Sequence, residues 1–304
     1  MARIFVTGGA GFIGSHLLKR LITLNHNILV IDDLSFGKIE SIPQRSRSLR
    51  FVKEDIVNKN LLVGLIEEFR PEIVIHLAAL HFIPHCNDHP VRTIEVNVIG
   101  TRCLIEACKI IKPNTFMFAS SAAVYGISNS KLSEEDLLEP TDIYGISKLI
   151  GEDLCRLFYR ETGVRTIITR IFNVYGPGET NPHIVPEIIK QLKKGKLEVE
   201  LGNIESKRDF INVRDVVGAF ISLLGNFRGE LGIFNIGSGK EYSIREVIET
   251  CERIIGREIK VKSSESRKRM DDRMHLLADI QKIMKETGWK PETDIEEELK
   301  ELLY

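Results

Sequence analysis

Residues 3–14 read Arg3-Ile4-Phe5-Val6-Thr7-Gly8-Gly9-Ala10-Gly11-Phe12-Ile13-Gly14. A short apolar run thus leads directly into a glycine-rich turn, and helical periodicity follows over 12–24. Such a turn presents bare backbone N–H groups at a helix N-terminus, where the helix dipole favours an anion such as a pyrophosphate. Gly8, Gly11 and Gly14 are spaced by three and three residues, whereas the usual fingerprint has two and three. The spacing indicates a variant dinucleotide-binding loop, and a turn that only reverses the chain is the alternative.

The pattern that follows predicts an α/β fold. Apolar runs near 3–7, 28–32, 50–53, 73–77, 115–119 and 166–171 alternate with helical periodicity near 12–24, 59–69, 91–111 and 144–161. This alternation predicts a parallel sheet with crossover helices. The runs carry Val, Ile and Phe at both alternating positions, which is typical of strands covered on both faces. We expect a doubly wound, Rossmann-type sheet.

The pattern changes after about residue 172, and this predicts a second part of the chain. Loops rich in Gly, Pro and Asn give way to isolated helices near 184–195, 214–225, 244–256 and 279–287. A chain of 304 residues also exceeds the usual size of one core. We expect a dinucleotide-binding domain over 1–172, completed by about 209–237. A smaller, interleaved α/β lobe over 173–304 would mainly bind the substrate.

The composition bears on which classes of binding partner are expected. Lys and Arg total 42 against 43 acidic residues, without a long block of one sign, so neither nucleic acid nor a membrane surface is an expected partner. The chain enters an apolar strand without a charged and then apolar leader, and it has no run long enough to span a bilayer. We expect a cytoplasmic location and a small ligand. The five cysteines form no CxxC pair, so they predict free thiols and no metal site.

The second apolar run ends in a pair of carboxylates that bears on the cofactor. Asp32 and Asp33 follow it about 20 residues after the glycine loop, where a carboxylate accepts hydrogen bonds from the adenosine ribose. A 2′-phosphate would be repelled there, and no arginine stands at the strand end to neutralise it. The pair therefore predicts NAD rather than NADP. The alternative is that the two residues only begin a turn.

A tyrosine and a lysine form a candidate catalytic pair. Tyr144 and Lys148 are four residues apart at the start of a helical stretch, so both side chains lie on one helix face. A cation about 5 Å from a phenol favours the phenolate by roughly 3 kcal/mol at an effective dielectric near 20. We therefore expect Lys148 to lower the pKa of Tyr144 and to make it a general base. Ser121, at the carboxyl end of the strand near 115–119, would hydrogen-bond the oxygen that loses its proton.

Nine motifs together resemble the extended short-chain dehydrogenase/reductase family, in particular its UDP-glucose 4-epimerase-like sugar-nucleotide enzymes. They are TGGAGFIG (7–14), IDDLSFG (31–37), HLAA (76–79), NVIGT (97–101), SSAAVYG (120–126), YGISK (144–148), RIFNVYGPG (170–178), RDFINV (208–213) and GWKP (288–291). The resemblance covers nearly the whole chain. It implies that Ser121, Tyr144 and Lys148 form a catalytic triad. It also implies a homodimer that pairs through the helices near 91–111 and 144–161.

The resemblance also assigns the binding residues. Those expected to bind NAD are Gly8, Gly11, Phe12, Ile13, Gly14, Asp32, Asp33, Ser35, Gly37, Asp55, Ile56, Leu77, Ala78, Ala79 and Asn97, together with Tyr144 and Lys148. Those expected to bind the nucleotide sugar are Ser121, Asn173, His183, Arg208 and Arg269. Guanidinium groups suit a diphosphate because each can bridge two phosphate oxygens, although surface charge alone is the alternative for both arginines.

Two positions in the substrate lobe need separate treatment. At one, this chain differs from related enzymes, and the other lies outside any fixed motif. His183 stands where related enzymes often carry asparagine, and it is either a ligand of the diphosphate or a loop histidine. Leu276 falls near the position that limits the sugar's 2-substituent in these enzymes. Leucine is smaller than the aromatic residue of strict glucose enzymes, so N-acetylated sugars are expected to fit.

The residues after Ser121 favour one reaction among those of the resembling enzymes. Relatives that dehydrate or decarboxylate the sugar carry acidic residues there, but this chain has Ala122 and Ala123, which cannot deliver a proton to a departing hydroxyl. The resemblance therefore implies epimerisation of a UDP-hexose at C4 through a 4-keto intermediate. The alternatives are a nucleotide-sugar dehydrogenase, reductase or dehydratase, and an inactive protein that only senses NAD.

Overall fold

The computed structural model describes residues 1–43, 46–179, 181–195, 197–264 and 273–304. Contacts between residues divide the chain into two units. The first unit comprises 1–126, 137–171 and 220–234, and the second comprises 127–136, 172–219 and 235–304.

A seven-stranded sheet forms the centre of the first unit in the described residues, with the order β10-β6-β5-β4-β1-β2-β3. The strands are β1 (Arg3–Thr7), β2 (Asn27–Asp32), β3 (Leu49–Lys53), β4 (Ile73–His76), β5 (Thr115–Ser121), β6 (Arg165–Ile171) and β10 (Leu231–Ile236). The ladders from β3 to β6 are parallel. After β3 the chain returns to pair β4 with β1, so the strand order reverses there. Open α/β sheets bind ligands at this point.

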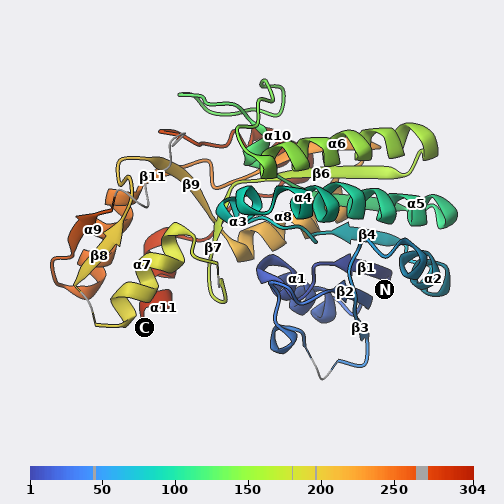
Figure 1. The fold of residues 1–304 in the computed structure, drawn as a ribbon, viewed down its shortest axis with the longest axis horizontal. Helices are drawn as coiled ribbons and strands as arrows, with labels where there is room; N and C mark the ends of the chain where they lie inside the picture. The colour runs from blue at the N-terminus through green and yellow to red at the C-terminus, as the bar shows by residue number, and fades with distance from the viewer. Residues whose placement is uncertain (44–45, 180, 196, 265–272) are drawn as a thin grey trace. The chain divides into compact units, whose positions relative to one another are not determined.

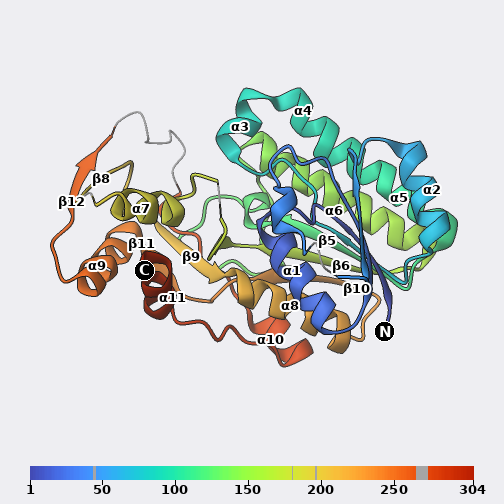
Figure 2. The same ribbon diagram turned by 90° about the horizontal axis from the view of Figure 1, so that it is seen from below.

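Helices cover both faces of this sheet, as Figures 1 and 2 show. The helices α2 (Lys59–Phe69), α5 (Thr101–Ile111) and α6 (Ile143–Thr162) share one apolar cluster with Phe5, Leu29 and Phe116. On the other face, α1 (Phe12–Thr23) packs close to β2 beside Gly9. A Cβ on Gly9 would lie 2.4 Å from Val30 of β2 and 3.2 Å from Leu18 of α1. The predicted doubly wound α/β fold is confirmed.

The helix expected over 91–111 is divided into three segments. They are α4 (Pro90–Ile94), a π-helical segment η2 (Glu95–Gly100) and α5, and a short helix α3 (Ile83–Asp88) precedes them. The Thr101 hydroxyl donates to the Asn97 carbonyl at 2.6 Å. A Cβ on Gly100 would lie only 2.5 Å from Ile56 Cδ1, so the segment packs closely there. The wider turn places Asn97 inside the protein, which the helical period does not predict.

The second unit is built on two small sheets in the residues that are described. One has the order β11-β9-β7 and the other pairs β12 with β8. The strands are β7 (Asn173–Tyr175), β8 (Glu198–Leu201), β9 (Lys207–Asn212), β11 (Glu241–Ser243) and β12 (Lys260–Ser263). Its helices are α7 (Ile184–Lys193), α9 (Ile244–Ile255), α10 (Gln281–Thr287) and α11 (Ile295–Leu303). Apolar residues of α7, α9 and α11 share one core, and Ser243 begins α9 with a capping box.

The boundaries between the units differ from the expected ones. Residues 127–136 belong to the second unit, and 220–234 rather than 209–237 complete the first. The helix α8 (Val213–Asn226) therefore contributes to both. Leu132 explains the first difference, because its carbonyl accepts from Asp279 N and Asn235 Nδ2, both at 2.8 Å. These partners are more than 100 residues away along the chain, so no local pattern predicts the exchange.

None of the helices described is long and apolar enough to cross a membrane.

Candidate active site

The structure brings Ser121, Tyr144 and Lys148 together in the first unit. Ser121 ends β5, and the other two lie in the first turns of α6. Asp142 fixes the start of this helix, because its carboxylate accepts from Gly145 N at 2.8 Å. Gly145 is required there, since a Cβ would lie 2.4 Å from the Ala123 carbonyl oxygen. The Ser121 hydroxyl is close enough to the Tyr144 phenol to lower the pKa of that phenol.

Lys148 is buried beside the tyrosine. Its Nζ donates to the Ala119 carbonyl at 2.8 Å and lies 5.9 Å from the centroid of the Tyr144 ring. It also lies 5.0 Å from the centroid of the Phe118 ring. Burial lowers the pKa of Lys148 to about 8. The ammonium therefore remains mostly charged at neutral pH while it is held against the strand.

The expected lowering of the tyrosine pKa is not observed. Burial raises the pKa of Tyr144, and this effect outweighs that of the nearby Ser121 hydroxyl, which acts to lower it. A nearby cation favours the phenolate, but the loss of hydration around the buried phenol opposes it and is the larger effect. The chain alone therefore keeps this phenol protonated at neutral pH.

The glycine loop has the geometry of a pyrophosphate cradle. Gly8 has φ +74°, and a Cβ there would lie 2.6 Å from Ala78 N. A Cβ on Gly14 would lie 2.3 Å from the Gly8 carbonyl oxygen, so both glycines permit close packing. Gly11 begins α1 without a side-chain cap, and among the described atoms its Cβ would meet only the Gly8 oxygen, at 3.3 Å. The first-turn N–H groups at Phe12, Ile13 and Gly14 are thus suited to an anion.

The expected adenosine residues lie beside this loop. Asp32 accepts from Ala10 N and Leu34 N, both at 2.9 Å, and burial raises the pKa of this carboxyl. Asp33 accepts from the backbone N–H and the hydroxyl of Ser35 at 2.9 and 2.7 Å, so this residue does begin a turn. A Cβ on Gly37 would lie 2.7 Å from Ala10 Cβ. The segment after β2 is therefore packed against the glycine loop.

The remaining expected cofactor residues follow β3 and β4. Asp55 forms an ion pair with Arg92 of α4, and Ile56 is buried against Gly100. Leu77 N and Ala78 N donate to the carbonyl and the hydroxyl of Thr7 at 3.1 and 3.2 Å, and Ala79 comes next along the chain.

Asn97 joins the segment after β4 to the helix α6. Its side chain accepts from Leu80 N at 2.8 Å and donates to the Leu80 carbonyl at 2.9 Å. Its Nδ2 also lies 2.9 Å from Ser147 Oγ on α6. Ser147 lies inside the YGISK motif, so the motif contains this contact although the sequence analysis gave the serine no role.

His76, in the HLAA motif, was not among the residues expected at the site. Its Nδ1 is 2.7 Å from Thr7 Oγ1, and its Nε2 is 2.8 Å from Thr101 Oγ1. The Thr101 hydroxyl already donates to the Asn97 carbonyl, so His76 Nε2 carries the proton and Nδ1 accepts from Thr7. Burial lowers the pKa of His76 to about 3. A neutral histidine therefore ties the first residue of the glycine loop to α5.

Three of the expected substrate residues lie on separate elements of the second unit, whereas Ser121 lies in the first. Asn173 begins β7, and its Oδ1 is buried without a hydrogen-bond partner in the described ranges. Arg208 lies on β9, where its Nη1 donates to the carbonyls of Lys207 and Arg273. His183 precedes α7 with Nδ1 3.8 Å from a Glu179 carboxylate oxygen. Arg269 lies outside the described residues.

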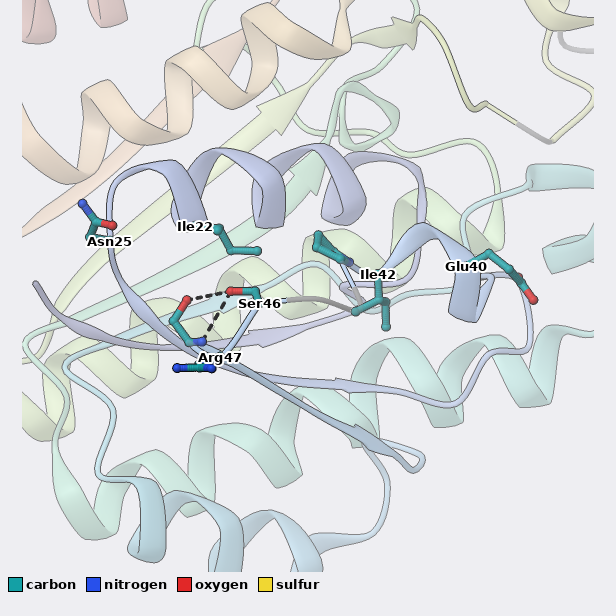
Figure 3. A pocket seen from close by; sticks show the side chains of 8 residues that line it. Ile22, Asn25, Glu40, Ile42, Ser46 and Arg47 are labelled. Atoms are coloured by element: carbon teal, nitrogen blue, oxygen red, sulfur yellow. Dashed lines mark hydrogen bonds between the residues drawn. The ribbon is translucent and has the colours of Figure 1, made fainter.

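A surface depression of about 850 Å³ lies elsewhere in the first unit, as Figure 3 shows. It is lined by Ile22, Asn25, Glu40, Ile42, Pro43, Ser46, Arg47 and Ser48. None of these is an expected catalytic or cofactor residue.

Comparisons with known proteins show which family this chain resembles in sequence and fold. A family model described as GDP-mannose 4,6 dehydratase matches residues 5–302. A GDP-6-deoxy-D-mannose reductase from Pseudomonas aeruginosa is 32% identical over 99% of this chain and 96% of its own length.

Two solved structures are similar in fold over almost the whole chain. A UDP-glucose 4-epimerase from Thermotoga maritima with UDP-glucose has a TM-score of 0.90 at 30% identity, over 99% of this chain and 97% of that one. A UDP-glucose 4-epimerase from Thermus thermophilus in complex with NAD has a TM-score of 0.89 with the same identity and coverage. These proteins are named for a dehydratase, a reductase and epimerases. The chain therefore belongs to the extended short-chain dehydrogenase/reductase family of nucleotide-sugar epimerases, dehydratases and reductases.

Proposed function

We propose that this protein epimerises a UDP-hexose at C4 with NAD as its cofactor, through a transient 4-keto sugar. One observation carries the proposal: Ser121, Tyr144 and Lys148 are together in the first unit, and only alanines follow the serine. This set can remove and return a hydroxyl proton. Ala122 and Ala123 cannot protonate a departing hydroxyl, so the set offers less to a dehydratase.

NAD fits the residues of the first unit. The cradle at Gly8, Gly11 and Gly14 would hold its pyrophosphate, and Asp32 and Asp33 would accept from the ribose hydroxyls, since a carboxylate keeps acceptor capacity beyond two backbone N–H groups. The neighbouring segments at 35–37, 55–56 and 77–79, with Asn97, would line the rest. When bound, NAD supplies a hydride acceptor for C4 oxidation and, once reduced, a hydride donor for return to the opposite face.

The chain's own residues then handle the proton. The chain alone keeps the Tyr144 phenol protonated, so its deprotonated form would need the positive charge of bound oxidised nicotinamide in addition to that of Lys148. In that form Tyr144 would accept the proton of the 4-hydroxyl when C4 is oxidised and give it back when the ketone is reduced, so the cycle neither gains nor loses a proton. Ser121 would hydrogen-bond the same oxygen and hold it in place. The Lys148 ammonium, 5.9 Å from the tyrosine ring centroid, would favour the phenolate.

The second unit is proposed to bind the nucleotide diphosphate. Arg208 and Arg269 would bridge phosphate oxygens, and Asn173 has a buried polar atom that is unpaired in the described ranges, as suits a residue awaiting a ligand. His183 would add a donor. Leu276, which is half-buried and held at its carbonyl by Asp209 N at 2.7 Å, would limit the sugar's 2-substituent and leave room for N-acetyl groups.

A homodimer in the cytoplasm is part of the proposal. Ile146 and Ile150 are exposed four residues apart on α6, and Val91 and Ile99 are exposed on the expected pairing helix. Exposed apolar side chains of this kind suit a second copy of the chain. All five cysteines are free thiols, which suits a reducing compartment.

A nucleotide-sugar reductase is the second candidate, because the Pseudomonas aeruginosa relative has that name at 32% identity. A reductase would use the same tyrosine and lysine. It would differ by consuming reduced cofactor in every turnover.

One assay separates these functions. Purified protein is incubated with UDP-galactose and NAD, and the sugars are resolved while the absorbance of reduced nicotinamide is followed. We expect UDP-glucose to appear without net change in reduced nicotinamide. A parallel incubation supplies a keto-sugar nucleotide and reduced cofactor, and net consumption of that cofactor there, without a C4 epimer in the first incubation, would establish the reductase instead. No C4 epimer from any UDP-hexose, while other nucleotide sugars react, would overturn the proposal.

A further inference from the structure

Glu152 and Arg170 form a buried ion pair behind the candidate active site. Their side chains are 0% and 1% exposed. Arg170 Nε donates to Glu152 Oε1 at 2.9 Å, and Nη2 donates to Oε2 at 2.8 Å. Burying two charges is costly even when they are paired in this bidentate way, so the pair is weak as a device for stability alone. Its other partners suggest a different task.

The pair holds both ends of the segment that contains Ser121. On one side, the Ser120 hydroxyl donates to Glu152 Oε1 at 2.7 Å. On the other side, Arg170 Nη1 donates to the Tyr125 hydroxyl at 3.0 Å, and the guanidinium carbon lies 4.9 Å from the tyrosine ring centroid. Ser121 and the 3₁₀ turn η3 (Ala122–Val124) lie between these two attachment points.

Glu152 also belongs to the helix that carries the other two candidate catalytic residues. The sequence positions 144, 148 and 152 are four apart, so the three side chains follow one face of α6. Lys148 bonds the Ala119 carbonyl and Glu152 bonds Ser120, so α6 is joined to β5 at two adjacent residues just before Ser121. These bonds fix the catalytic strand end against the catalytic helix.

We propose that the Glu152–Arg170 pair is a positioning unit that holds Ser121 against Tyr144, with Ser120 and Tyr125 as its attachment points. The inference rests on the proposed function, since it gives these residues a part in the same reaction centre. Proton transfer needs donor and acceptor within hydrogen-bond reach, and a misplacement of about 1 Å costs on the order of a hundredfold in rate.

The opposite end of the same two strands offers a matched control. Arg165, at the start of β6, donates through Nε to Thr115 Oγ1 at 2.9 Å and through Nη1 to the Phe227 carbonyl at 2.9 Å. Thr115 is buried and begins β5, whereas Ser120 is buried near its end. Thr115→Val therefore removes a buried hydroxyl bond from β5 without touching the segment around Ser121.

The kinetic test compares isosteric deletions. Ser120→Ala and Tyr125→Phe are each expected to lower kcat about tenfold with KM within about twofold. Thr115→Val is expected to leave kcat within about twofold while it lowers thermal stability by a similar amount to Ser120→Ala. Equal losses of kcat in Ser120→Ala and Thr115→Val would overturn the inference, as would unchanged kcat in both Ser120→Ala and Tyr125→Phe.

A second measurement needs no substrate. In protein labelled with ¹³C-tyrosine, the ring signal of Tyr144 is identified by its loss in Tyr144→Phe. We expect this signal to shift in Ser120→Ala, because the Ser121 hydroxyl beside the phenol is displaced, and to stay in place in Thr115→Val. A Tyr144 signal that is the same in all three proteins would overturn the inference. If the wild type turns over no nucleotide sugar, the proposed function fails, and the signal alone decides the positioning role.

Discussion

The two units hold their candidate functional residues in different ways. In the first unit Ser121, Tyr144 and Lys148 stand where a buried strand ends and a long helix begins, and they contact one another or the same strand. In the second unit Asn173, His183 and Arg208 stand on three separate elements. His183 lies near Glu179, and Arg208 bonds backbone carbonyls.

This difference predicts which kinetic constant each unit controls. Groups held by a buried network keep a fixed geometry, so their loss is expected to lower the rate of the chemical step. The residues of the second unit are proposed to bind parts of the substrate that do not react, so their loss is expected to raise KM.

Tyr144→Phe is expected to have the largest effect. Without the hydroxyl no side chain at this position can take the sugar proton, so kcat is expected to fall about a thousandfold while KM changes little. Initial rates with the nucleotide sugar that the wild type converts measure this. Tyr159→Phe is the control on the same helix, because its hydroxyl bonds Glu230 at 2.6 Å on the surface. An active Tyr144→Phe enzyme would remove the chemical step from this residue.

Arg208→Lys tests the second unit. Lysine keeps the charge but loses the planar fork, so KM for the nucleotide sugar is expected to rise about tenfold while kcat stays within about threefold. The control is Arg245→Lys, at an exposed arginine that forms an ion pair with Glu205. A fall in kcat with constant KM would instead place Arg208 with the reaction residues and end the division between the units.

The parts of the fold that sequence could predict are those set by local pattern. Apolar runs located β1 to β6, and helical periods located α1, α2 and α6, because burial on two faces or on one stripe leaves a period in the chain. The exchange of 127–136 depends on Leu132 meeting Asp279 and Asn235, and such distant contacts leave no period. The π-helical segment depends on Asn97 turning inward, for the same reason.

In the candidate site, too, the sequence predicts the features set by local pattern and not those set by distant contacts. Glycine spacing and the Tyr144–Lys148 interval are local, so the sequence predicts them and the structure places them together. The raised pKa of Tyr144 comes from burial by surrounding elements, and it could not be read from the interval. One signal was available for the buried pair: Arg170 is a charged residue inside an apolar run, and such a residue requires a partner.

Acid unfolding tests the buried hydrogen-bond network of the first unit through its histidine, His76. Burial lowers the pKa of His76 from 6.5 to about 3, so between these values the unfolded chain binds a proton that the folded one does not. The free energy of unfolding therefore falls as pH is lowered through this window, by up to about 1.4 kcal/mol per pH unit from this group. Urea unfolding at a series of pH values measures the slope.

Two variants separate proton linkage from lost hydrogen bonds. His76→Gln is expected to lower stability at pH 7 and to reduce the acid slope by as much as one proton. Thr101→Val removes two bonds from the network, those to His76 Nε2 and to the Asn97 carbonyl, but keeps the histidine, so it is expected to lower stability and retain the slope. If both variants keep the wild-type slope, another group causes the acid sensitivity.

The smallest effects come from the caps of one helix in each unit. Asp142 caps α6 of the first unit, and Ser243 caps α9 of the second unit by accepting from Glu246 N at 3.1 Å. Either residue changed to alanine is expected to cost about 1 kcal/mol in urea unfolding. The two alanine variants should then differ in kcat, because only α6 begins with a candidate catalytic residue. Asp142→Ala is expected to lower kcat about threefold, and Ser243→Ala to leave it unchanged.

Asp142→Asn tests the cause of that difference, because asparagine keeps the cap and removes the charge. Burial is the main cause that raises the pKa of Tyr144, and the charge of Asp142 adds to it. The asparagine variant should therefore retain stability and lower the pKa of the tyrosine, with kcat at neutral pH equal to or above that of the wild type. If it loses as much kcat as Asp142→Ala, the carboxylate charge matters more than the helix start. The cap would then belong to the chemistry of the first unit rather than to its fold.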